Sequence, residues 1–187
     1  MPETKKQPRL DAPSLAAFAK ELETGGGPPP VDQWNPDHCG DSEMRIAADG
    51  RWYHQGGLIK RPAMVRLFSS VLRREEDGGY VLVTPVEKLS IEVEHLPFRA
   101  VVMKHEGKGK KRRIGFELNT GEALIANADH PIRMVKGERG PSPRLLVRGR
   151  LEAEIERPLY YELAEIAIQE GADPPGIWSD GTFFAFD

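Results

Sequence analysis

Two apolar helical patterns in this sequence begin with an arginine followed by a proline. The first is IKRPAMVRLFSSVL, residues 59–72, and the second is IERPLYYELAEIAI, residues 155–168. Proline suits the start of a helix because its missing N–H would be unpaired there, and it holds the preceding residue extended. Arg61 and Arg157 therefore stand where a carboxylate or hydroxyl usually caps the free N–H groups. A guanidinium beside a positive helix end suits the binding of a phosphate or another anion.

The arginines have a second interpretation, in which each lies along the surface and pairs with a neighbouring carboxylate such as Glu156. Arg66 and Glu162 hold equivalent positions in the two patterns and carry opposite charges. If both helix starts line one groove, Arg66 and Glu162 would meet across it. This adds Arg66 to the predicted ligand site.

Two turn motifs contribute further candidates for the ligand site. Thr84 and Glu87 belong to VTPVEK, at the expected junction between two domains, where ligand clefts often form. A bend that only reorients the chain is the alternative. His130 follows Asp129 in NADHPIR, where an imidazole and a carboxylate suit a turn, a ligand contact or a general base.

The motif PDHCGD, residues 36–41, contains the single cysteine of the chain, Cys39. A zinc site recruits four ligands at defined spacings, and no second Cys or His pair completes one here. A nucleophilic cysteine needs an activating base that the fold must supply. The sequence predicts neither a metal nor a cofactor.

The run KHEGKGKKRR, residues 104–113, is the only dense group of basic residues. It lies where two strands should turn, and its glycine spacing is not that of a phosphate-binding P-loop. We interpret it as a solvated hairpin tip. Docking to an acidic surface or a nucleic-acid backbone is the alternative, but the overall charge is negative and no aromatic platform for stacking bases flanks the run.

The composition is that of an ordinary globular protein. The 187 residues are 39% hydrophobic and 29% charged, with a net charge of −3, so nucleic acid and anionic membranes are not expected partners. No apolar run approaches the length that spans a bilayer, and the first residues lack the apolar stretch of a secretory signal. We expect a bacterial protein in the cytoplasm.

The pattern of elements predicts two domains of the α+β class. Residues 1–30 read as a mobile tail, a short helix and a Gly/Pro linker, and residues 31–85 as a sheet with a helix from Pro62. Residues 86–187 read as seven short strands followed by a helix, which is typical of a bent sheet or a partly closed barrel closed by that helix. We expect the last strand, TFFAFD, to pair back into this sheet.

The two Arg-Pro patterns also raise the hypothesis of an internal duplication. Four of fourteen positions are identical, at Ile59/Ile155, Arg61/Arg157, Pro62/Pro158 and Leu67/Leu163, and glycine-containing turns flank both patterns. The repeated unit would be a strand, an Arg-Pro helix and a strand. Convergent chemistry of helix starts is the alternative.

The segment from Asp49 to Glu94 resembles a bacterial family known as domain of unknown function 1285. The likeness rests on Asp49, Gly50, Trp52, His54, Ile59, Arg61, Leu67, Phe68, Tyr80, residues 82–88 and 129–131, Trp178, Gly181, Phe183 and Phe184, and it extends over residues 31–186. The resemblance implies two domains built as a duplicated unit, the second similar to a pleckstrin-homology fold. It further implies a site for a nucleotide-like ligand between the domains and a role in signal transduction, and it implies no catalytic activity.

These observations together predict a protein that binds rather than transforms its ligand. We expect a small anionic, nucleotide-like molecule in a cleft between the domains, contacted by Arg61, Arg66, Thr84, Glu87, His130 and Arg157. One alternative is a hydrolase or transferase that uses Glu87, His130 or Cys39. Another is a protein-interaction module that docks through the barrel surface or the basic hairpin.

Overall fold

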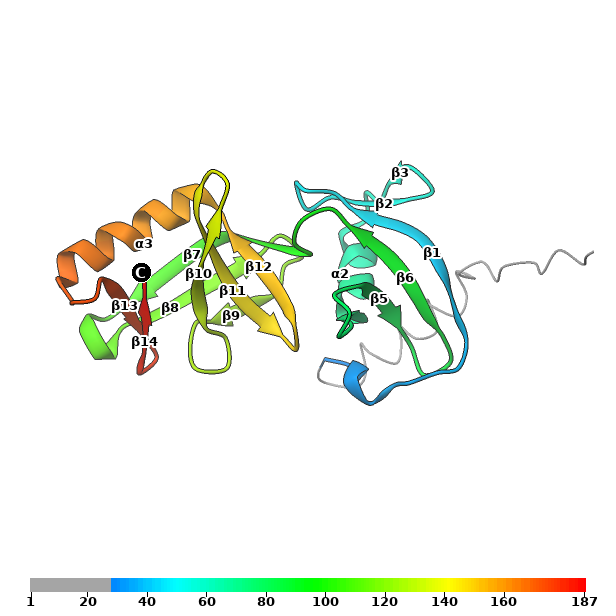
Figure 1. Ribbon diagram of the computed structural model, residues 1–187, viewed down its shortest axis with the longest axis horizontal. Helices are drawn as coiled ribbons and strands as arrows, with labels where there is room; N and C mark the ends of the chain where they lie inside the picture. Colours follow the sequence, from blue (N-terminus) through cyan, green and yellow to red (C-terminus); the bar gives the residue numbers. More distant parts are fainter. Residues whose placement is uncertain (1–27) are drawn as a thin grey trace, which may run out of the picture. The chain divides into compact units, whose positions relative to one another are not determined.

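The computed structural model describes residues 28–187 (Figure 1). The predicted tail and short helix lie outside these residues. The chain divides into two compact units between Glu94 and His95. Neither of the two α-helices in the described part of the chain is long and apolar enough to cross a lipid bilayer.

In the described residues, the first unit is a six-stranded mixed sheet with one α-helix. Its strands lie in the order β3-β2-β1-β6-β5-β4, and β1 and β6 are parallel while the other neighbours are antiparallel. The elements are η1 (Val31–Gln33), β1 (Cys39–Ile46), β2 (Trp52–His54), β3 (Gly57–Leu58), α2 (Pro62–Ser70), β4 (Leu72–Arg74), β5 (Tyr80–Val83) and β6 (Lys88–Val93).

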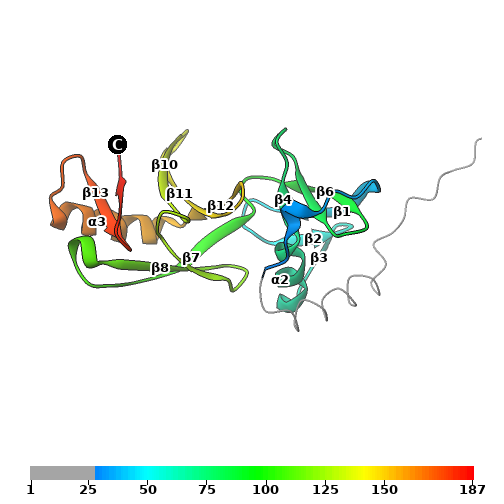
Figure 2. The same ribbon diagram turned by 90° about the horizontal axis from the view of Figure 1, so that it is seen from below.

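Alternation along the central strands builds the core of the first unit. Met44 and Ile46 on β1 and Leu89 and Ile91 on β6 are buried, as period-2 side chains on one face of a sheet must be. The α2 helix lies against the sheet (Figure 2), where the ring of Phe68 stacks on that of Trp52 with centroids 6.4 Å apart.

The division between the units lies at Glu94 rather than at the predicted Pro85. The reason is β6, which pairs with β1 on one side and with β5 on the other and so belongs to the middle of the first sheet. The segment VEKLSIEVE was expected to open the second domain. It instead closes the first, because its strand pairs with a partner more than 40 residues earlier in the chain.

The second unit is also a six-stranded mixed sheet, in the order β10-β11-β12-β7-β8-β9. Its elements are β7 (Phe98–Glu106), η2 (Gly109–Lys111), β8 (Arg113–Leu118), β9 (Ala123–Ile125), β10 (Ile132–Gly137), β11 (Gly140–Arg148), β12 (Leu151–Ile155), α3 (Arg157–Glu170), β13 (Gly176–Ser179) and β14 (Thr182–Ala185). Because β9 and β10 are the two edges, the sheet does not close into a barrel. The last strand, β14, pairs with β13 in a separate hairpin rather than with this sheet, contrary to expectation.

The two sheets share one topology, as a duplicated fold requires. In each, three strands form an antiparallel meander, three more form a second one, and the first strand runs parallel to the sixth at the centre. The helices do not follow this symmetry, since α2 follows the third strand of its unit and α3 the sixth. The two Arg-Pro patterns therefore do not occupy equivalent places, and the units share their sheets rather than the proposed strand-helix-strand repeat.

Candidate functional site

The beginning of α2 combines positive charge with an uncapped helix end. Arg61 is the N-cap residue, with extended dihedral angles of φ −85° and ψ 112°, and no side chain of the described residues caps the helix. The N–H groups of Met64 and Val65 both donate to the carbonyl of Arg61, at 3.0 and 3.3 Å. Pro62 has no N–H, so the free donor in this turn is the N–H of Ala63.

Three cationic side chains lie in or just before the first half of α2, and none of them pairs with a carboxylate of the described residues. Lys60, Arg61 and Arg66 are exposed and form no ion pair within the described part of the chain. Arg66 lies five residues beyond Arg61, which turns it about 140° around the helix axis. Lys60 and Arg61 precede Ala63 by three and two residues in the chain, whereas Arg66 projects from another side of α2.

The beginning of α3 has a different electrostatic environment. Its N-cap residue is Glu156, and Arg157 is the first helical residue, one position earlier than Pro158 was expected to begin the helix. The Glu156 carboxylate accepts a hydrogen bond from Nε of Arg99 at 3.0 Å, and Arg157 donates to the carbonyl of Arg139 at 3.3 Å. The predicted pairing of Arg157 with Glu156 is not formed, and the negative charge of Glu156 already complements the helix dipole.

Thr84 and Glu87 form a tight turn between β5 and β6, inside the first unit. The backbone N–H of Thr84 donates to the carbonyl of Glu87 at 2.8 Å, and the Thr84 hydroxyl accepts the N–H of Glu87 at 3.2 Å. Val83, beside this turn, donates to the carbonyl of Val71 at the far end of α2. The helix places about 15 Å between the Cα atoms of Arg61 and Val71, so Thr84 and Glu87 are not brought to the α2 start.

His130 stabilises the connection between β9 and β10. Its ring Nδ1 lies 3.2 Å from the carbonyl oxygen of Leu146, and its backbone N–H donates to Oδ1 of Asn127 at 3.0 Å. Asn127 rather than Asp129 is thus the residue that shapes this turn. Arg157 contacts the carbonyl of Arg139, which follows β10, whereas His130 precedes that strand. A six-residue strand separates its two ends by about 20 Å, so the structure does not bring His130 and Arg157 together.

The residues of the predicted ligand site are therefore distributed over both units. Arg61, Arg66, Thr84 and Glu87 belong to the first unit, and His130 and Arg157 belong to the second. The shared groove remains a prediction. The residues of the alternative catalytic set are also divided between the units. Exposed Cys39 on β1 lies opposite Lys88 on β6, the residue after Glu87, whereas His130 belongs to the second unit.

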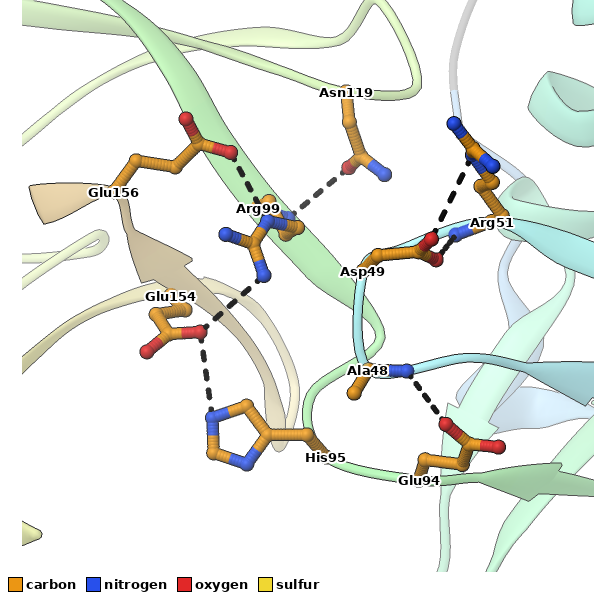
Figure 3. A network of polar contacts seen from close by, with 9 residues as sticks. All are labelled: Ala48, Asp49, Arg51, Glu94, His95, Arg99, Asn119, Glu154 and Glu156. Atoms are coloured by element: carbon orange, nitrogen blue, oxygen red, sulfur yellow. Dashed lines mark hydrogen bonds and ion pairs between the residues drawn. The ribbon is translucent and has the colours of Figure 1, made fainter.

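The residues on either side of the division are each bound to their own unit (Figure 3). The Glu94 carboxylate accepts a hydrogen bond from the N–H of Ala48 at 2.8 Å and forms an ion pair with Arg45. These two contacts lower the pKa of the Glu94 carboxyl. His95 lies 3.4 Å from the Glu154 carboxylate, which also pairs with Arg99 at 3.6 Å. These contacts anchor Glu94 to the first unit and His95 to the second. The sequence pattern did not predict them.

The second sheet contains a buried carboxylate that sequence patterning also missed. The side chain of Glu152 on β12 is 5% exposed and contacts Arg133 at 2.5 Å and Arg144 at 3.4 Å. Burial by itself raises the pKa of Glu152, but the hydrogen bonds and charges of the two arginines outweigh it and hold the pKa below its ordinary value. The Glu152 carboxylate is therefore paired with two cations of its own sheet.

A concavity with a volume of about 490 Å³ lies in the first unit, beside an irregularity in β1. The register between β1 and β6 shifts between Asp41 and Arg45, and Glu43 adopts a left-handed conformation with φ 56°. The polar side chains that line the concavity are Asp41, Glu43, Arg45, Ser90 and Glu92. Three carboxylates face one arginine that already pairs with Glu94, so this surface is unsuited to an anion.

The basic hairpin tip, residues 104–113, is not merely solvated. Arg112 is buried and pairs with Glu170 of α3 at 2.5 Å. Nζ of Lys110 lies 5.1 Å from the ring centroid of Trp178 on β13. The aromatic neighbour that the local sequence lacks is supplied by a residue almost 70 positions later.

Comparison with known proteins places the chain among relatives with the same two-part organisation. The family model described as domain of unknown function (DUF1285), N-terminal domain, matches residues 29–96. The model described as protein of unknown function (DUF1285), C-terminal domain, matches residues 97–186. A search of the curated proteins finds no match.

Two solved structures resemble the chain. The crystal structure of a DUF1285 family protein from Silicibacter pomeroyi DSS-3 is 45% identical, with a TM-score of 0.79 over 91% of this chain and 93% of that one. A DUF1285 family protein from Shewanella baltica OS155 is 23% identical, with a TM-score of 0.52 over 66% of this chain and 91% of that one, and supports the fold alone. The chain belongs to the DUF1285 family.

Proposed function

We propose that the protein binds a small anionic, nucleotide-like ligand without transforming it, and that the beginning of α2 holds the anionic group. The observation that carries this proposal is the N-cap Arg61, which is exposed, has no ion pair in the described residues and precedes an uncapped helix. Cationic charge at this end opposes the helix dipole by about 0.3 to 1 kcal/mol. A bound anion would turn that cost into a gain.

The geometry of the α2 start suits a phosphate group in particular. The N–H of Ala63 and the guanidinium of Arg61 supply donors of the kind that charge-assisted hydrogen bonds to phosphate use. Lys60 adds a second positive charge just before the N-cap, where the corresponding residue of the second pattern is Glu156. This one difference favours α2 over α3 as the anion site.

Binding is better supported than catalysis by the placement of the candidate groups. The ring of His130 lies against the carbonyl of Leu146, and Thr84 and Glu87 are engaged in their own turn. The second unit has the order of six strands followed by a helix, which is in keeping with the pleckstrin-homology comparison that the family resemblance implies, although its sheet is open. We propose a regulatory role in signal transduction, in which occupancy of the site is the signal.

Calorimetric titration tests this function. We expect pyrophosphate, AMP or ATP to release or absorb heat at concentrations up to about 1 mM, since weak single-site binding lies in that range. Arg61→Ala should weaken binding at least about 10-fold, the value of one charge-assisted hydrogen bond. Arg51, which is exposed in the same unit and pairs with Asp49, provides the matched control Arg51→Ala.

The outcomes separate the alternatives. Weakening by Arg61→Ala but not by Arg51→Ala supports the site. No heat with any of the three ligands, or equal affinity in wild type and Arg61→Ala, would contradict it. Turnover of a phosphoester by the purified protein would favour the hydrolase or transferase instead.

A further inference from the structure

The basic tip, residues 104–113, has a fixed backbone. Gly107 has φ 75°, and a Cβ atom there would lie 2.6 Å from the carbonyl oxygen of Lys111, so only glycine fits. Arg112 is anchored to Glu170, which also accepts the N–H of Gly109 at 3.2 Å. The tip lies beside β13 and the end of α3 (Figure 1), and these contacts tie its backbone to the second unit.

Four lysines of this tip have no counter-charge in the described part of the chain. Arg112 is neutralised by Glu170, and Arg113 by Asp180 at 3.4 Å and Glu106 at 3.8 Å. The lysines are exposed and form no ion pair, and they are Lys104, Lys108, Lys110 and Lys111. The tip therefore carries a local positive charge that the neighbouring carboxylates do not balance.

An aromatic pair borders the lysines. The rings of Trp178 and Phe183 lie on the β13–β14 hairpin with centroids 5.3 Å apart and an interplanar angle of 53°. Both residues are half-buried, and Lys110 contacts Trp178 through a cation–π interaction. A site for single-stranded nucleic acid combines two features. Basic side chains lie along the path of the sugar-phosphate backbone, and aromatic side chains offer faces on which the bases stack.

The same surface does not fit a lipid membrane. Membrane-surface elements insert exposed apolar side chains beside their basic residues. Among the described residues, the exposed large apolar side chains are Leu58, Val86, Val102, Tyr161 and Ile168, and none of them belongs to the tip or to the β13–β14 hairpin. The chemistry of this surface therefore favours a phosphodiester chain with stackable bases.

We propose that the basic tip and Trp178 form a binding surface for single-stranded nucleic acid, separate from the anion site on α2. Lys108, Lys110 and Lys111 would contact successive phosphates, and a base would displace Lys110 from the ring of Trp178 and stack there. The overall net charge of −3 keeps this binding weak and confined to the tip. The contacts carry no base-edge reading, so the surface discriminates little between sequences.

Fluorescence anisotropy of a labelled single-stranded oligonucleotide of about 12 nucleotides, titrated with the full chain at several salt concentrations, tests the proposal. Each neutralised phosphate contributes about −0.7 to the slope of log K against log salt. Replacement of Lys108, Lys110 and Lys111 by alanine should reduce the magnitude of the slope by about 2. Trp178→Leu should weaken binding about 10-fold at an unchanged slope, and Trp178→Phe should restore most of it.

The control removes three exposed cations elsewhere in the same unit, by Lys136→Ala, Arg139→Ala and Arg150→Ala together. It should leave the slope close to that of the wild type. Loss of slope in the lysine variant but not in the control supports the proposal, as does rescue by Trp178→Phe. No binding by the wild type, equal losses in both triple variants, or binding to anionic phospholipid vesicles but not to the oligonucleotide would overturn it.

Discussion

At the scale of single residues, charge decides which of two similar segments suits an anion. Residues 59–62 and 155–158 differ only at the second position, which is Lys60 in one and Glu156 in the other. In the structure Glu156 provides a negative charge at the N-cap of α3 and pairs with Arg99. Within residues 28–187, no carboxylate compensates the charge at the start of α2, so the shared Arg-Pro sequence has opposite electrostatic consequences at its two positions.

Glu152 is the residue on which we expect the stability of the second unit to depend most clearly. Glu152→Gln keeps the shape but removes the charge that Arg133 and Arg144 contact, and should lower the free energy of unfolding by about 1.5 to 3 kcal/mol. Urea denaturation at pH 7 measures this change. Gln in place of exposed Glu117, which has no ion pair within the described residues, is the matched control and should change stability little.

The same carboxylate predicts a pH dependence. Its pKa in the folded protein lies below the reference value of 4.5, so its contribution to stability is present above that value and is lost as the pH falls through the folded pKa. The difference in stability between wild type and Glu152→Gln should therefore shrink as the pH is lowered from 5. A difference that stays constant or grows over this interval would contradict the role of the charge.

At the scale of elements, local chemistry could be predicted from the sequence and long-range pairing could not. The helix starts at Pro62 and Pro158 were predicted to within one residue, because proline and its neighbour fix the backbone locally. The sheet to which β6 belongs was not predicted correctly. A short strand with β-branched residues fits either sheet, and its partner β1 lies far away in the chain. The contact between Lys110 and Trp178 was missed for the same reason.

The basic tip offers a test of one such element. Gly107→Ala forces a Cβ atom against the Lys111 carbonyl and should destabilise the protein by about 1 to 3 kcal/mol, with loss of the ordered tip. Gly109 in the same tip also has positive φ, at 52°, but a Cβ there meets nothing within 4 Å. Gly109→Ala is thus the control for backbone conformation alone. Equal destabilisation of the two variants in thermal denaturation would show that the steric contact does not matter.

At the scale of the whole molecule, the chain consists of two sheets with one strand order and different helices. The duplication was anticipated from the helix starts, but the structure locates it in the sheets. A repeated sheet leaves each copy free to acquire its own surface. The first unit carries the uncapped cationic helix start, and the second carries the basic tip with its aromatic neighbour.

The central claim is that an anion binds at the start of α2 and not at the start of α3. The most direct measurement is an NMR titration of the full, ¹⁵N-labelled chain with pyrophosphate, which reports on every backbone amide in both units. We predict the largest shift at the amide of Ala63, with the amide of Leu159 in the first turn of α3 unaffected. A larger shift at Leu159, or no shift at Ala63 at saturating pyrophosphate, would contradict the claim.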